Sequence, residues 1–253
     1  MSWIGLKTIV RRECGVIVRY WGITLAPPVI TTILYFIVFG EVFGKRIGSF
    51  DGIDYIRYIA PGLIVLWVIP YSFGHTASGF LGARFFKFIE ELLVSPLPDW
   101  VVMTGYVLGG IARGFLVGTA VVLTTLFFTP LDVHSICVSV VALFLAALVS
   151  ALGGFITGML AKTFEHVITI QILILTPLTY IGGVFSSVSM LPKWAQDLSL
   201  ANPMFYMVNT FRYGILGVSD VPVGVAFSVV CACGAVLFFA AAKLMARGTG
   251  FRD

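Results

Sequence analysis

Residues 133–161 read VHSICVSVVALFLAALVSALGGFITGMLA, and this stretch decides the fold. It contains no Asp, Glu, Lys or Arg, and the nearest charges are Asp132 and Lys162 on its two flanks. A helix needs about 20 mostly apolar residues to cross the hydrocarbon core of a bilayer. The stretch is therefore long enough and apolar enough to cross a membrane as one helix.

Five further gaps between charged residues have the same character. Charges bracket four of them, and a single charge, Arg113, interrupts the fifth. The expected spans lie at about 22–39, about 58–80, about 101–128, between Glu165 and Lys193, and between Asp220 and Lys243. Together with the first stretch they predict an all-α, polytopic membrane protein with six transmembrane helices in a single domain, residues 1–253.

The composition argues against a soluble domain. Hydrophobic residues make up 59% of the chain, charged residues make up 11%, and the mean hydropathy is +1.02. Soluble domains carry about 25% charged residues. The net charge of +4 comes without a dense Lys/Arg run, so we expect no nucleic-acid partner. The four cysteines have no metal-binding or redox spacing.

Basic residues indicate the orientation. Six crossings put both termini on one side, and that side carries ten basic residues: Lys7, Arg11, Arg12, Arg19, Arg84, Lys87, Lys162, Lys243, Arg247 and Arg252. The opposite side carries five: Lys45, Arg46, Arg57, Lys193 and Arg212. Lys and Arg collect on the cytoplasmic side of membrane proteins. We therefore expect a multi-pass protein of the cell (inner or plasma) membrane with both termini cytoplasmic.

Two segments outside the spans are amphipathic. Residues 1–20 mix apolar and basic side chains, which is typical of an interfacial helix against anionic lipid headgroups; an unstructured basic tail is the alternative. Residues 84–100, RFFKFIEELLVSPLPDW, predict a short cytoplasmic helix that ends at the prolines. This helix either offers its polar face to a soluble partner or lies at the interface without one.

Three stretches carry a resemblance to a known family. They are FIEELLVSPLPDWVVMTGYVLGG (88–110), LTPLTYIGGVFSS (175–187) and ANPMFYMVNTFRYGILG (201–217). In this order they resemble the ABC-2 type permease family of ATP-binding-cassette exporters, over nearly the whole chain. The resemblance implies that the loop after the second span docks onto an ATPase, with a coupling role for Glu90, Glu91, Leu92 and Leu93. It also implies an outer re-entrant segment at 190–212 that includes Asn202, Pro203 and Arg212.

The sequence lacks a glycine-rich phosphate cradle of the form G-x-x-x-x-G-K-[ST]. The nearest match, GEVFGKR at residues 40–46, is one residue short in its spacing and lacks the hydroxyl residue that would bind Mg²⁺. No residues have the spacing of a metal site or of an acid–base or nucleophile pair. We therefore expect no catalytic, cofactor or metal site in this chain, and expect ATP and Mg²⁺ on a separate ATPase.

Arg113 stands inside a predicted span, where exposure to lipid costs about 2.5–3.5 kcal/mol. It either lines or gates a passage, or it pairs internally with backbone carbonyls. Closely spaced glycines surround it and let helices approach: Gly105, Gly109, Gly110, Gly114 and Gly118. Aromatic and hydroxyl residues of other spans are further candidates for a translocation path, with ordinary lipid-facing positions as the alternative: Tyr35, Trp67, Tyr71, Thr176 and Tyr180.

These observations lead to a hypothesis about function. Two copies of the chain, with a separate ATPase, would export an amphipathic or lipid-like molecule such as a drug, a lipid or a glycan precursor. An ion-gradient-driven transporter, a membrane-embedded enzyme and a scaffold are the alternatives. Gradient coupling usually needs carboxylates inside the membrane, and no Asp or Glu falls within a predicted span.

Overall fold

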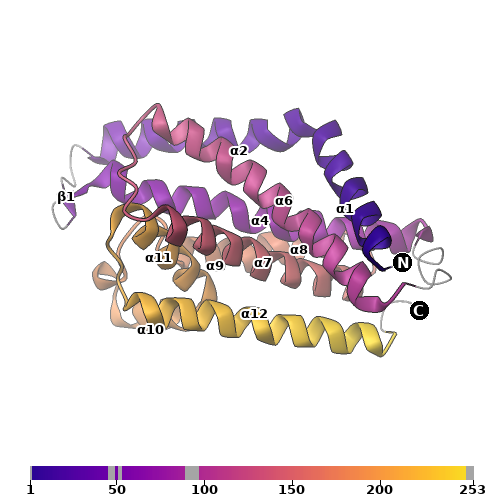
Figure 1. Cartoon of the computed structure of the whole chain (residues 1–253). Coiled ribbons are helices and arrows are strands. Elements are labelled where there is room, and N and C mark those ends of the chain that lie inside the picture. Colours follow the sequence, from indigo (N-terminus) through magenta and orange to yellow (C-terminus); the bar gives the residue numbers. More distant parts are fainter. Residues whose placement is uncertain (1, 45–48, 51–52, 89–96, 249–253) are drawn as a thin grey trace.

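The fold is almost entirely helical. The computed structural model describes all residues except 1, 45–48, 51–52, 89–96 and 249–253 (Figure 1). Its elements are α1 (Ser2–Arg19), α2 (Trp21–Tyr35), the π-helix η1 (Phe36–Gly44), β1 (Ser49–Phe50), β2 (Ile53–Asp54), α4 (Tyr55–Phe85), α6 (Asp99–Leu126), α7 (Ile136–Leu160), α8 (Phe164–Ile170), the π-helix η2 (Gln171–Leu175), α9 (Thr176–Ile181), the 3-10 helix η3 (Val188–Met190), α10 (Lys193–Leu200), α11 (Pro203–Leu216) and α12 (Val223–Ala246). The strands β1 and β2 form a short antiparallel pair.

The prediction of six transmembrane helices is confirmed. Within the described residues, six helices are long and apolar enough to cross a membrane: Trp21–Gly40, Tyr55–Phe85, Asp99–Leu126, Ile136–Leu160, Phe164–Ile181 and Val223–Ala246. Each overlaps one of the six spans expected from the sequence. The start of α1 and the end of α12 lie at the same end of the bundle, and β1 lies at the opposite end (Figure 1).

Helix α4 forms the centre of the bundle. It packs against α6, α7 and α11, and most of its length is buried. Three peripheral spans are much more exposed. Only 17–22% of the most apolar stretch of each is buried within the chain; these spans are Trp21–Gly40, Phe164–Ile181 and Val223–Ala246. Apolar side chains on these three spans have hydrocarbon or another protein chain as their natural environment.

Glycines allow the central helices to approach closely. A Cβ atom on Gly154 or Gly158 of α7 would lie 2.3 Å and 2.7 Å from the carbonyl oxygens of Phe73 and Ala77 on α4. On α6, Gly110 and Gly114 face the side chains of Thr76 and Ser72 at similarly short range. The close packing expected from the glycine spacing of α6 is therefore present, and α7 adds a second glycine face against α4.

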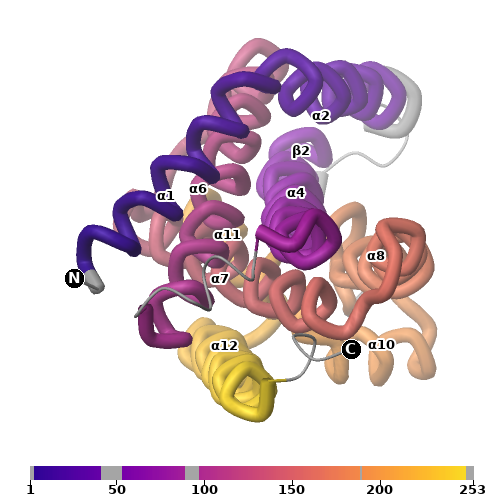
Figure 2. Tube along the Cα trace, turned by 90° about the vertical axis from the view of Figure 1, so that its right-hand side faces the viewer, coloured from indigo at the N-terminus to yellow at the C-terminus, as the bar shows by residue number. Residues whose placement is uncertain are grey.

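Helix α1 lies across one end of the bundle. Viewed along the spans, α1 is seen lengthwise, whereas α2, α4 and α12 are seen end-on (Figure 2). Its Ile9 and Glu13 are buried against Gly105 and Gly109 of α6, while Trp3 and Ile4 are exposed. The basic N-terminal segment is thus an ordered amphipathic helix rather than an unstructured tail; its place at the lipid interface stays a prediction.

The link between the second and third spans is described only at its ends. Helix α4 ends at Phe85, a turn with Lys87 at φ 61° follows, and Pro98 caps the start of α6. The expected coupling residues, Glu90, Glu91, Leu92 and Leu93, lie outside the described residues. The exposed aromatic side chains of Phe85, Phe86 and Phe88 precede them.

The expected re-entrant region at 190–212 consists of two helices. Helix α10 ends before Asn202, whose side chain accepts a hydrogen bond from the backbone N–H of Met204 and donates one to the carbonyl of Leu178. Pro203 occupies the first turn of α11, where its missing N–H costs nothing. Helix α11 is largely buried against α7, α12 and α4. Its depth in the bilayer stays a prediction.

Adding a methyl group at Gly154 tests the close contact of α4 and α7. In Gly154→Ala, the new Cβ would lie 2.3 Å from the backbone oxygen of Phe73, so the two helices must separate. Overpacking of this kind costs about 1–3 kcal/mol. We expect a lower midpoint of thermal unfolding for the detergent-solubilised protein. Gly224→Ala is the control because a Cβ added there would meet no described atom within 4 Å outside the backbone of its own helix turn, and equal midpoints in the two variants would contradict the packing described here.

Candidate functional site

A cavity of about 490 Å³ lies between α4, α6 and the α8–η2–α9 span. It is lined by Leu66, Trp67, Pro70, Tyr71, Gly74, His75, Ser78, Arg113, Gln171, Leu175, Thr176, Thr179 and Tyr180. Five candidate path residues from the sequence are in this wall: Trp67, Tyr71, Arg113, Thr176 and Tyr180. The sixth, Tyr35 of α2, joins them because its hydroxyl lies 2.7 Å from that of Tyr180.

The fifth span is irregular where it lines this cavity. Between α8 and α9 it forms the π-helix η2, and Pro177 stands in the first turn of α9. Proline cannot donate a backbone hydrogen bond, and π-turns absorb such interruptions within a helix. The hydroxyl of Thr176 donates to the carbonyl of Gln171 at 2.9 Å and closes this turn. The side-chain oxygen of Gln171 would lie 3.0 Å from a Cβ on Gly74, so the glycine makes room for it.

A second cavity of about 420 Å³ adjoins the first. It is lined by residues of α1, the second half of α4 and α8, including Arg12, Glu13, Gly79 and Phe164. The two cavities share four wall residues: Gly74, His75, Ser78 and Arg113. We call the two cavities together the groove. It follows one face of α4 from Leu66 to Ala83.

A chain of polar contacts crosses the shared wall. Arg113 Nη1 lies 3.2 Å from Nδ1 of His75, and Nε2 of the same ring lies 3.1 Å from Glu13 Oε2. A guanidinium only donates, so Nδ1 must accept and the proton of neutral His75 sits on Nε2, facing the carboxylate. Arg12 donates to Glu13 Oε1 at 2.8 Å and to the hydroxyl of Tyr106 at 2.5 Å.

Glu13 is ionised in this arrangement. Burial by itself would raise the pKa of its carboxyl, but the contacts with His75 and Arg12 outweigh burial and hold the pKa below its usual value. The sequence interpretation missed Glu13 because an acid in an amphipathic helix suggests a solvent-facing position. Helical spacing contained the signal, since Ile9, Glu13 and Ile17 recur every four residues and all three are buried.

Arg113 has side-chain partners. Besides His75, it donates to Thr24 Oγ1 at 3.0 Å, and its guanidinium lies 5.6 Å from the ring centre of Tyr71. The contacts described for Arg113 are therefore with hydroxyl, imidazole and phenol groups of neighbouring spans, and none of these contacts is with a backbone carbonyl. The residue lies in the wall of both cavities.

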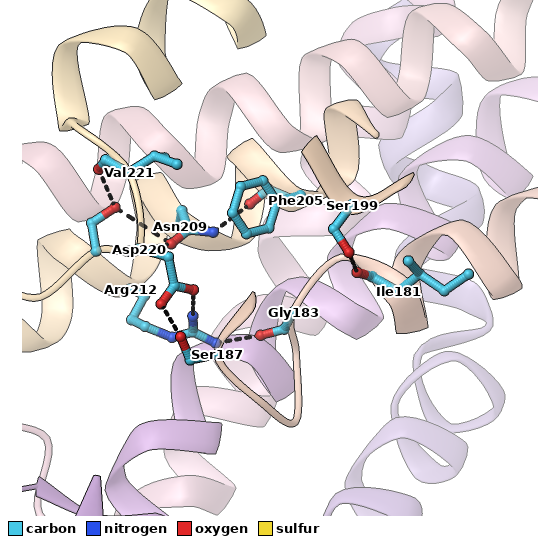
Figure 3. Close-up of polar contacts among 10 residues, drawn as sticks. Ile181, Gly183, Ser187, Ser199, Phe205, Asn209, Arg212, Asp220 and Val221 are labelled. Atoms are coloured by element: carbon cyan, nitrogen blue, oxygen red, sulfur yellow. Dashed lines mark hydrogen bonds and ion pairs between the residues drawn. The ribbon is translucent and has the colours of Figure 1, made fainter. Parts of the chain in front are cut away.

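Arg212, expected in the outer re-entrant segment, is buried in a separate cluster (Figure 3). Its guanidinium lies 3.4 Å from Asp220 Oδ2, donates to the carbonyl of Gly183 at 2.5 Å, and stacks 4.1 Å from the ring centre of Tyr58. Asn209 accepts from the backbone N–H of Asp220 at 2.9 Å. The cluster ties α11 to α4, to the turn after α9 and to the loop before α12.

A bundle of six membrane helices with a polar groove along its central helix has the architecture of a transport permease. A family model described as ABC-2 type transporter matches residues 5–216. The chain belongs to this family. It is therefore the membrane permease subunit of an ABC transporter and a multi-pass protein of the inner membrane.

Individual relatives agree with this assignment. The inner membrane transport permease YadH of Escherichia coli (strain K12) is 45% identical over 253 residues, which is 100% of this chain and 99% of the relative. Nodulation protein J of Rhizobium meliloti (strain 1021) is 26% identical over 85% of this chain and 82% of the relative. The putative transport permease ycf38 of Cyanophora paradoxa is 23% identical over 76% of this chain and 67% of the relative.

Replacing Arg212 tests its cluster. In Arg212→Met the buried cation is lost, and Asp220, whose side chain is 16% exposed, keeps the hydrogen bond from Ser187 but has no cation beside it. Breaking a buried ion pair in this way costs about 3–5 kcal/mol, so the thermal midpoint should fall strongly. Arg57→Met is the control, because its pair with Asp132 is exposed and such pairs contribute about 0–1 kcal/mol. Similar losses in the two variants would contradict a clamping role for Arg212.

Proposed function

We propose that this permease forms one half of an export path that a second copy of the chain completes. The observation that carries the proposal is the groove, in which Arg113, Gln171 and Thr176 lie between apolar spans. Polar groups at membrane depth are stable only against protein or water. Hydrocarbon therefore cannot cover the groove, whereas a second protein chain can.

The spans that flank the groove have apolar faces for such a partner. Helices α2 and α8 lie on either side of α4 (Figure 2). The side chains of Leu34 on α2 and Leu173 on η2 are 53% and 68% exposed. A two-fold pair would bury these faces and enclose two grooves around one axis. Helix α12 is also exposed, but it lines neither cavity, so lipid can cover it.

We assign the energy source to a separate ATPase chain, which would hold ATP and Mg²⁺. The family membership supports this assignment, and so does the lack of a phosphate cradle in the sequence. Glu90, Glu91, Leu92 and Leu93 are the proposed docking residues. The end of α4 and the start of α6, which flank them, lie at the same end of the bundle as α1 (Figure 1). The excess of basic residues supports a cytoplasmic position for this end and for both termini.

The proposed cargo is an amphipathic or lipid-like molecule, such as a drug, a lipid or a glycan precursor, and the proposed direction is export. Support comes from the wall of the first cavity, which combines the apolar side chains of Trp67 and Leu66 with the hydroxyls of Ser78 and Tyr71. Sites of this kind hold an apolar body and fix its polar end by a few hydrogen bonds. Family membership argues against the gradient-driven, enzymatic and scaffold alternatives.

The double variant Glu90→Ala with Glu91→Ala tests the coupling to the ATPase. The tagged chain is purified from its native membranes in mild detergent, and the co-purifying chain that carries the phosphate cradle is quantified together with ATP turnover. A central contact in an interface contributes about 2 kcal/mol or more, so the complex should bind at least about tenfold more weakly and turnover should fall with it.

Asp197→Ala is the matched control for this experiment. It removes an acid too, in this case an exposed one on α10 at the opposite end of the bundle (Figure 1), and should leave assembly and turnover unchanged. Normal assembly and normal ATP turnover in the double variant would refute the docking assignment. ATP hydrolysis by the purified permease alone would refute the separate ATPase.

A further inference from the structure

Arg113 differs from three other arginines of the described part of the chain, each of which has a carboxylate within ion-pair distance. These pairs are Arg12 with Glu13, Arg57 with Asp132 and Arg212 with Asp220. Among the described residues, Arg113 contacts only neutral groups: the imidazole of His75, the hydroxyl of Thr24 and the ring of Tyr71. Its charge has no counter-ion within the described structure.

Glu13 does not supply the missing charge. One oxygen of its carboxylate accepts from Arg12, and the other faces Nε2 of His75, which separates it from Arg113. The three charged groups around the shared wall carry +1 (Arg12), −1 (Glu13) and +1 (Arg113). The net charge of these three side chains is therefore +1, and the unpaired positive charge, that of Arg113, lies where the two cavities meet.

The guanidinium also has hydrogen-bonding capacity to spare. Its Nε is buried and has no hydrogen-bond partner among the residues that the structure describes. A buried cation with an unused donor is unfavourable unless another group enters the site. Guanidinium presents its donors in a planar fork that fits the oxygens of phosphate and carboxylate groups.

We propose that Arg113 binds the anionic group of an amphipathic cargo, a phosphate, phosphonate or carboxylate carried on an apolar chain. The anion lies against Arg113 at the meeting point of the cavities, and the apolar part extends along Trp67 and Leu175 in the first cavity. His75 is a positioning residue, because its Nδ1 accepts from Arg113 and keeps the guanidinium in the wall. This inference rests on the proposed transport function in treating the anion as cargo.

Binding to the full-length permease tests the inference without an ATPase. Four of the five tryptophans, Trp3, Trp21, Trp100 and Trp194, are replaced by Phe, so that Trp67 in the cavity wall reports binding by its fluorescence. The protein is placed in phosphatidylcholine nanodiscs and titrated with octyl phosphate, octyl glucoside and inorganic phosphate. The first two probes share the same apolar chain and differ in charge, and the third has the charge without the chain.

We expect octyl phosphate to bind at least about tenfold more tightly than octyl glucoside, because charge-assisted hydrogen bonds are about twice as strong as neutral ones. Arg113→Gln should abolish this preference, and Arg113→Lys should retain part of it, which shows that the site still folds. Arg57→Gln removes the same charge far from the groove, from a pair with Asp132, and should keep the full preference.

Two results would overturn the inference: an unchanged preference in Arg113→Gln, or equal binding of octyl phosphate and octyl glucoside to the unmodified site. Inorganic phosphate that binds as tightly as octyl phosphate would overturn the amphipathic part. If octyl phosphate does not bind but the permease still forms an active complex with its ATPase, the anion site alone is rejected. If octyl phosphate binds but no functional complex with an ATPase forms, the proposed transport function alone is rejected.

Discussion

The constraint on which this structure depends is that a charged side chain at membrane depth must be covered by protein or water. Arg113 meets this constraint by facing a groove whose wall supplies His75 and Tyr71, and by donating a hydrogen bond to Thr24 of α2. Hydrocarbon offers no comparable partners, and exposing the arginine to it would cost several kcal/mol, about 2.5–3.5 by insertion scales. This is why we propose that the groove is completed by a second copy of the chain, which would cover its open side.

Close packing of the helices brings the groove and the N-terminal helix into contact. Helix α6 uses separate glycine faces for its two neighbours: Gly105 and Gly109 receive α1, and Gly110 and Gly114 receive α4. Because α1 lies so near α6, the carboxylate of Glu13 reaches His75 on α4. A movement of α1 would thus change the contacts of the residue that holds Arg113. Away from the groove, the buried Arg212 cluster holds α11 against α4 and against the turn after α9.

Much of this arrangement could be predicted from the sequence. Bilayer thickness fixes how many apolar residues a crossing helix needs, so the length of an uncharged stretch indicates whether it can cross. The spans and the grouping of Trp67, Tyr71 and Tyr180 followed from that rule and from the positions of aromatic residues. The partners of Arg113 did not follow, since they come from two other helices, α2 and α4, and only the packed structure shows which hydroxyl or imidazole lies nearby. Glu13 was missed because the burial of its helix face depends on glycines nearly a hundred residues further along the chain.

The central claim is that a second copy covers the groove, and cross-linking in native membranes tests it most directly. The four native cysteines are replaced, and single cysteines are introduced by Leu34→Cys on α2, Leu173→Cys on η2 and, as control, Phe239→Cys on α12, all at positions exposed in the single chain. The cysteines are oxidised in each single variant and in the variant that carries both Leu34→Cys and Leu173→Cys. The variants at Leu34 and Leu173 should give disulfide-linked dimers, and Phe239→Cys should give none. Dimers only through α12, or monomers throughout, would contradict the account.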